Sequence, residues 1–75
     1  MTVTVKLEKT DIYDVYELAC STNDQVYVHS LDDTVKIDAK SNIGLMWLRF
    51  DNPVKIVSEN ESVCSEAKKR WGISL

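Results

Sequence analysis

The sequence is poor in residues that interrupt regular structure, with one proline and two glycines among 75 residues. No linker, internal repeat or low-complexity tract divides the chain. A protein of this size buries only about 60% of the surface of its unfolded chain, so its core is thin. We therefore expect a single domain over residues 1–75, with the ordinary globular balance of 44% hydrophobic and 28% charged residues.

Positive charge is also scarce. The chain has nine Lys and Arg against twelve Asp and Glu, which gives a net charge of -3. A general nucleic-acid binder needs an excess of cations to displace the counterions of phosphates, so this class is disfavoured. The one basic run, Lys68-Lys69-Arg70, falls at the end of a predicted helix, where cations suit the negative end of the helix dipole. We expect no nucleic-acid partner.

Long apolar runs, metal-ligand patterns and targeting signals are missing as well. No window is long enough to span a bilayer, and the alternating start of the chain lacks the basic segment of a signal peptide. Cys20 and Cys64 lie far apart without a CxxC or CxxH pattern, and two thiols with one histidine make a poor metal site. We expect a cytoplasmic protein with reduced thiols and with no membrane, metal or cofactor; a disulfide between the two cysteines is the alternative.

Four strands are predicted from the spacing of apolar residues. Alternation of apolar and polar side chains indicates strands at residues 2–7 and 34–39. Runs rich in β-branched and aromatic residues indicate two more at residues 25–30 and 54–58. The short polar turn between the second and third strands predicts a hairpin.

Three helices are predicted from apolar residues three and four positions apart, at residues 11–21, 42–50 and 62–71. Thr10 or Asp11 is expected to cap the first helix, Ser41 the second and Ser62 the third, because Ser, Thr and Asp are favoured N-caps. Pro53 follows the second helix and Gly72 the third.

The predicted order is therefore β-α-β-β-α-β-α. It indicates an α+β fold in which helices cover one face of a sheet and the other face meets water. The apolar stripes predict a buried core made of Val3, Val5, Leu7, Ile12, Val15, Ala19, Val35, Ile37, Leu45, Leu48, Val54, Ile56, Ala67 and Trp71.

The most informative stretch is residues 38–48, which read DAKSNIGLMWL. It resembles the second-helix motif of HPr, the phosphocarrier of the bacterial sugar phosphotransferase system, which reads roughly (N/D)AKS-x-(M/I)-G-(I/V/L)-M-x-L. The predicted element order is also that of HPr, so the resemblance extends along essentially the whole chain. It implies an HPr-like open-faced β-sandwich, with a four-stranded antiparallel sheet and three helices on one face.

The phosphoacceptor histidine of HPr is missing. In that family a His-x-Arg-Pro type of segment joins the first strand to the first helix, and its histidine carries the phosphate at the helix N-terminus. Residues 7–13 of this chain read LEKTDIY, in which Glu8 and Asp11 would repel a phosphate. The single histidine, His29, falls in the second predicted strand, and we do not assign it as a replacement acceptor.

The second helix retains candidate functional residues. Ser41 matches the serine that a dedicated kinase phosphorylates in many HPr proteins, although it is equally a good N-cap. Ile43 and Met46 match the apolar surface through which HPr docks onto its partners, and Trp47 adds an aromatic side chain of the kind enriched in binding hot spots. The alternative is that Trp47 faces the core and the other two are ordinary exposed apolar residues.

We therefore expect a regulatory or protein-binding relative of HPr that is not an enzyme. Its partners would be proteins of the phosphotransferase system or an HPr kinase, bound through the second helix. Two alternatives remain: a working phosphocarrier of the sugar phosphotransferase system with an unrecognised acceptor, and a domain that retains only the fold.

Overall fold

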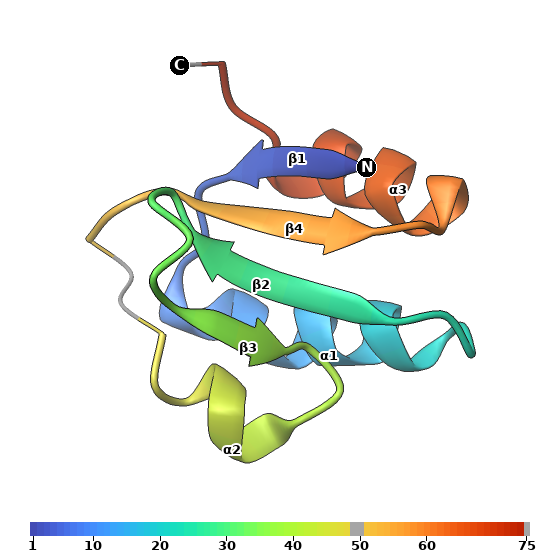
Figure 1. The fold of residues 1–75 in the computed structure, drawn as a ribbon, viewed down its shortest axis with the longest axis horizontal. Coiled ribbons are helices and arrows are strands. Elements are labelled where there is room, and N and C mark those ends of the chain that lie inside the picture. The colour runs from blue at the N-terminus through green and yellow to red at the C-terminus, as the bar shows by residue number, and fades with distance from the viewer. Residues whose placement is uncertain (49–50, 75) are drawn as a thin grey trace.

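The computed structural model describes residues 1–48 and 51–74 and has α+β architecture (Figure 1). Four antiparallel strands form one sheet in the order β1-β4-β2-β3, and they are β1 (Thr2–Val5), β2 (Val26–Ser30), β3 (Lys36–Asp38) and β4 (Val54–Ser58). The helices in the described residues are α1 (Ile12–Cys20), α2 (Asn42–Leu45) and α3 (Glu61–Trp71), with a short 3-10 turn, η1 (Lys9–Asp11), before α1. The predicted α+β class and the predicted four-stranded antiparallel sheet are thus confirmed.

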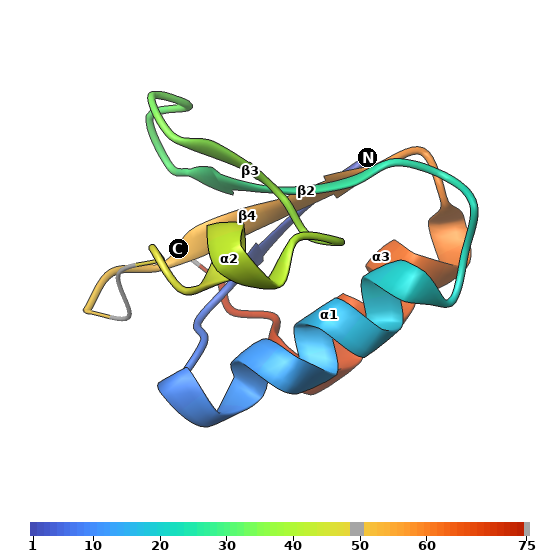
Figure 2. The same cartoon turned by 90° about the horizontal axis from the view of Figure 1, so that it is seen from below.

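The helices lie on one side of the sheet (Figure 2). β4 is the last strand in sequence but runs between β1 and β2, where Ile56 pairs with Val3 on one side and with Val28 on the other. These three side chains form an apolar row on the face that the helices cover. The other face of the sheet has no helix over it in the described part of the chain, as predicted from the order of the elements.

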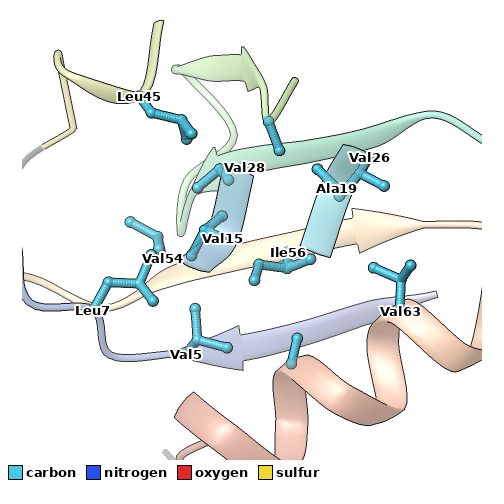
Figure 3. Close-up of a cluster of buried hydrophobic side chains, with 12 residues drawn as sticks. Val5, Leu7, Val15, Ala19, Val26, Val28, Leu45, Val54, Ile56 and Val63 are labelled. Carbon is cyan, nitrogen blue, oxygen red and sulfur yellow. The ribbon is translucent and has the colours of Figure 1, made fainter. Parts of the chain in front are cut away.

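The core lies between the sheet and the helices, and side chains from the strands, α1 and α2 point into it (Figure 3). Most of the predicted core residues are buried there, and Val3, Ile12, Ile37, Leu48 and Trp71 are half-buried and pack against it. The buried set also contains residues outside the predicted core list: Val26, Val28, Ala39, Val63 and Cys64.

The prediction that Val35 is buried is wrong. Its side chain is 48% exposed, and β3 begins only at Lys36. Val35 stands just before β3, at the end of the β2–β3 hairpin, and this end bends away from the helices (Figure 2). The alternation of apolar residues along a strand predicts which face of the sheet each side chain lies on. It does not predict how far the layer of helices extends over that face.

The second helix is shorter than predicted. It ends at Leu45, and two of the amide groups that follow bond three residues back, from Trp47 N–H to the Gly44 carbonyl at 3.1 Å and from Leu48 N–H to the Leu45 carbonyl at 3.1 Å. Met46 and Trp47 therefore stand in a tightened turn after α2. The predicted end of this helix, at residue 50, lies outside the described residues.

Two predicted helix caps are also corrected. Asn60, and not Ser62, caps α3, because its side-chain oxygen accepts the Val63 N–H at 2.9 Å. Asp11 makes no cap bond to α1; its carboxylate instead accepts the Glu8 N–H at 2.8 Å, across η1. Asn and Ser are nearly equal as N-caps, so composition could not decide between them.

After α3 the chain returns to the edge of the sheet. Gly72 N–H closes the helix on the Lys68 carbonyl at 2.9 Å, and Ile73 N–H then donates to the Thr4 carbonyl of β1 at 3.0 Å. The last described residues thus cover part of the β1 edge.

None of the helices in the described ranges has the length and apolar character needed to cross a membrane.

Candidate functional site

The segment before α2 is held by a compact set of hydrogen bonds. The Asp38 carboxylate accepts the Lys40 N–H at 2.9 Å, and the Asp38 carbonyl accepts the Ser41 N–H at 3.0 Å. The Lys40 ammonium group reaches across to the Thr22 carbonyl at 2.7 Å, in the loop that follows α1. These contacts fix where α2 begins relative to both β3 and α1.

Ser41 is the N-cap of α2, as predicted. Its hydroxyl oxygen accepts the Gly44 N–H at 3.2 Å, and its carbonyl accepts the Leu45 N–H at 3.0 Å. The residue is half-buried. The hydroxyl therefore has a structural role already, and its phosphorylation stays a prediction.

Leu45 anchors α2 to the rest of the domain. Its side chain has no exposed surface and points into the core cluster (Figure 3). Gly44 lies so close to β3 that a Cβ atom there would stand 2.8 Å from a methyl carbon of Ile37. Leu45 turns inward, Gly44 faces the strand and Leu48 packs against the core, whereas the other large apolar side chains of this segment are exposed to solvent.

Three of these side chains form the α2 surface, which we define as Ile43, Met46 and Trp47. Their exposed fractions are 73%, 74% and 79%, the highest among the exposed large hydrophobic residues in the described ranges. The three line one shallow apolar depression. The alternative in which Trp47 faces the core is therefore wrong, and the predicted grouping of the three on one surface is what the structure has.

A second hollow, which the sequence did not reveal, lies on the other side of Trp47. It has a volume of about 170 Å³, and its walls are Ser30, Val35, Trp47, Leu48, Asn52 and Val54. Its lining is almost wholly apolar. Val35 and Val54 come from different parts of the sheet, so sequence spacing carried no signal that they meet Trp47.

The junction between β1 and α1, where HPr proteins hold their phosphate, has a different construction here. The chain forms η1 here. The Asp11 carboxylate accepts a hydrogen bond from the Glu8 N–H at 2.8 Å, and the Asp11 N–H donates to the Glu8 carbonyl at 2.9 Å. A backbone donor that would attract an anion is thus bonded to the chain's own carboxylate. Glu8, Lys9 and Thr10 are exposed around it.

His29 lies on the open face of the sheet, away from the start of any helix in the described residues. Its Nδ1 atom is 3.1 Å from the Asp33 carboxylate, which also bonds the Lys55 ammonium group at 2.8 Å. Asp33 sits in the β2–β3 turn with a positive φ of 62°. The bond from Lys55, and then that from His29, hold the pKa of Asp33 below its usual value. The arrangement pins the hairpin end to the sheet.

The two cysteines are unpaired in the structure. Cys20 is exposed at the end of α1, whereas Cys64 is buried at the start of α3, with its sulfur 3.6 Å from the Ser58 carbonyl oxygen. Among the described residues, no cluster of His, Cys, Asp and Glu side chains is suited to hold a metal ion.

Comparison with family models, with curated proteins and with solved structures finds no match to this chain. The structure establishes a small α+β domain with a four-stranded antiparallel sheet. The resemblance to HPr rests on the residues of the second-helix motif and on the order of the elements.

Proposed function

We propose that this chain is a divergent HPr-like domain that does not carry phosphate and acts as a regulatory, protein-binding relative of the phosphotransferase system. Its partner, an HPr kinase or another phosphotransferase protein, docks on the α2 surface. The observation that carries the proposal is the exposure of Ile43, Met46 and Trp47, at 73%, 74% and 79%, on a segment that Leu45 holds firmly against the core.

Exposing an apolar surface of this kind to water is unfavourable, and a bound partner would remove this cost by covering it. Monomeric proteins rarely expose contiguous apolar patches larger than a few hundred Å², and the largest apolar patch on a monomer is often functional. The other exposed large apolar residues of the described chain, such as Tyr13 and Met1, stand on other elements. Trp and Met are also among the residue types enriched in interfaces.

Two places in the domain support the proposal that it does not carry phosphate: the β1–α1 junction and the surroundings of His29. The β1–α1 junction has no histidine, and the Glu8 N–H there already donates a hydrogen bond to the Asp11 carboxylate. His29 lies in β2 and not at the start of a helix, and its Nδ1 atom is 3.1 Å from the Asp33 carboxylate, so this nitrogen already has a partner. We therefore propose that the domain is not an enzyme and receives no phosphate from phosphoenolpyruvate.

Ser41 would connect docking to regulation in this proposal. Phosphorylation would add about −1.5 to −2 charges two residues before Ile43. The bond from the Gly44 N–H shows that the Ser41 oxygen faces the start of α2, so the added charge would lie at the edge of the α2 surface. Partners that accept an anion there would be favoured, and purely apolar partners would be weakened.

The direct experiment is calorimetric titration of an HPr kinase with the wild-type domain and with Met46→Asp. A charge in the centre of the contact should weaken binding by about 2 kcal/mol, close to thirtyfold, as expected for a hot-spot residue. Ser65→Asp is the matched control, because it adds the same charge at an exposed position of α3, which packs on β1 and β4 at the other end of the sheet.

The outcome that contradicts the proposal is equally clear. If the kinase binds wild type and Met46→Asp with equal affinity, or binds neither at concentrations near a millimolar, the α2 surface is not its docking site. Circular dichroism of each variant shows whether the fold is intact, which we expect because Met46 is 74% exposed.

A further inference from the structure

The α2 surface and the hollow beside it are complementary in shape. Trp47 has 79% of its surface exposed and lines both apolar depressions. The hollow bounded by Val35, Leu48 and Val54 has a volume of about 170 Å³. Cavities of about 150 Å³ accept an aromatic ring of benzene size. One face of the molecule therefore carries both an exposed aromatic ring and a hollow that fits such a ring.

We propose that a second copy of this chain binds here, through a two-fold symmetric contact in which each Trp47 enters the hollow of the other molecule. The inference rests on the proposed docking role of the α2 surface and names one of its occupants. A two-fold interface needs a patch that is complementary to itself, and an exposed ring next to a hollow that fits such a ring meets that condition. The two indole rings would meet in an offset stack, because Trp47 is also a wall of the hollow.

The charge distribution favours the same occupant. The chain has a net charge of -3, so two copies repel each other in general. Among the described residues, however, those lining the two depressions carry no charge; they are Ser30, Val35, Ile43, Met46, Trp47, Leu48, Asn52 and Val54. A contact centred on Trp47 thus buries apolar area, and no charged side chain of the described residues lines either depression.

The exposed apolar area predicts a weak dimer. At about 200 Å² for a large side chain, the exposed parts of Ile43, Met46, Trp47 and Val35 amount to roughly 500 Å². Two copies would bury on the order of 1,000 Å², which is the lower limit for a specific interface. The dimer should therefore form and dissociate with concentration, so that the α2 surface remains accessible to a tighter partner.

The test is sedimentation equilibrium of the purified chain alone, from about 10 μM to about 1 mM, which spans weak association constants. Wild type and Ser65→Asp should rise from the 8.6 kDa monomer toward twice that mass, whereas Met46→Asp and Ile43→Lys should stay at 8.6 kDa. Both α2-surface residues are at least 73% exposed, so the variants should fold, and two independent variants guard against a failure of either.

A wild-type chain that remains monomeric up to about 1 mM overturns the inference, and so does a dimer that survives both α2-surface substitutions. Neither result bears on the proposed function, because no kinase is present in this experiment. Conversely, a chain that dimerises through Trp47 while binding no kinase would refute the proposed partner and leave the symmetric contact in place.

Discussion

At the scale of single residues, the turn between β2 and β3 shows how one carboxylate organises a loop. One oxygen of Asp32 accepts from the Ser30 hydroxyl at 2.7 Å, from the Thr34 hydroxyl at 2.8 Å and from the Thr34 N–H at 3.2 Å. These bonds, from Ser30 first and then from Thr34, lower the pKa of Asp32 from 3.8 to about 2. The neighbouring Asp33 can then take a positive φ and reach Lys55 and His29.

This turn predicts a pH dependence of stability. The pKa of Asp32 is lower in the folded state, so its stabilising contribution is complete above its ordinary value of 3.8 and is lost as the pH falls through about 2. Thermal unfolding followed from neutral pH down to about pH 2 should therefore show a smaller loss of Tm in Asp32→Asn than in wild type below about pH 4. Identical slopes in the two proteins would mean that the carboxylate is not bonded in this way.

The α2 surface could be predicted from the sequence, whereas the hollow beside it could not. Ile43, Met46 and Trp47 lie close together in the sequence, so a motif could group them. The hollow needs Val35 and Val54 to meet Trp47, and this depends on the pairing of β2 with both β3 and β4. The bond of Asp33 to His29 and Lys55 was hidden for the same reason, because a left-handed turn residue is not evident from composition.

At the scale of elements, the type of each strand and helix was predictable and the ends were not. β4 was predicted with its observed bounds, and in the structure Val54, Ile56 and Ser58 are its buried residues, in strict alternation. The shorter α2 and the change of cap from Ser62 to Asn60 depend on single hydrogen bonds, to the Gly44 and Leu45 carbonyls and from Val63 N–H. Several residues near the ends of these helices could have made such hydrogen bonds, so the sequence did not determine the residue at which each helix begins or ends.

The end of α3 supplies the prediction at this scale. A Cβ atom at Gly72 would stand 2.4 Å from the Lys68 carbonyl oxygen, which is backbone and has no room to move. We expect Gly72→Ala to lower the free energy of unfolding by about 1–3 kcal/mol, the usual range for overpacking. Urea unfolding measures the change, with Ser74→Ala as the control at an exposed position two residues on. Equal midpoints for all three proteins would show that α3 does not end as tightly as described.

At the scale of the whole molecule, a thin two-layer domain leaves one sheet face and the α2 surface without cover in the described part of the chain. The layers follow from the alternation of two apolar periods along the chain, which is why the α+β class was predictable. The same periods leave the strand order open, because the placement of β4 between β1 and β2 is a long-range property. The proposed function depends on two features: an exposed α2 surface and a β1–α1 junction without an acceptor.

The central claim is that this domain docks without carrying phosphate, and one measurement tests it most directly. The chain is incubated with phosphoenolpyruvate and the general phosphotransferase enzyme, and in parallel with ATP and an HPr kinase, and each product is examined by mass spectrometry at neutral and acid pH. We expect no phosphate in the first reaction and an acid-stable phosphate on Ser41 in the second. Acid-labile phosphate on His29 in the first reaction, abolished by His29→Ala, would contradict the account and make the domain a phosphocarrier.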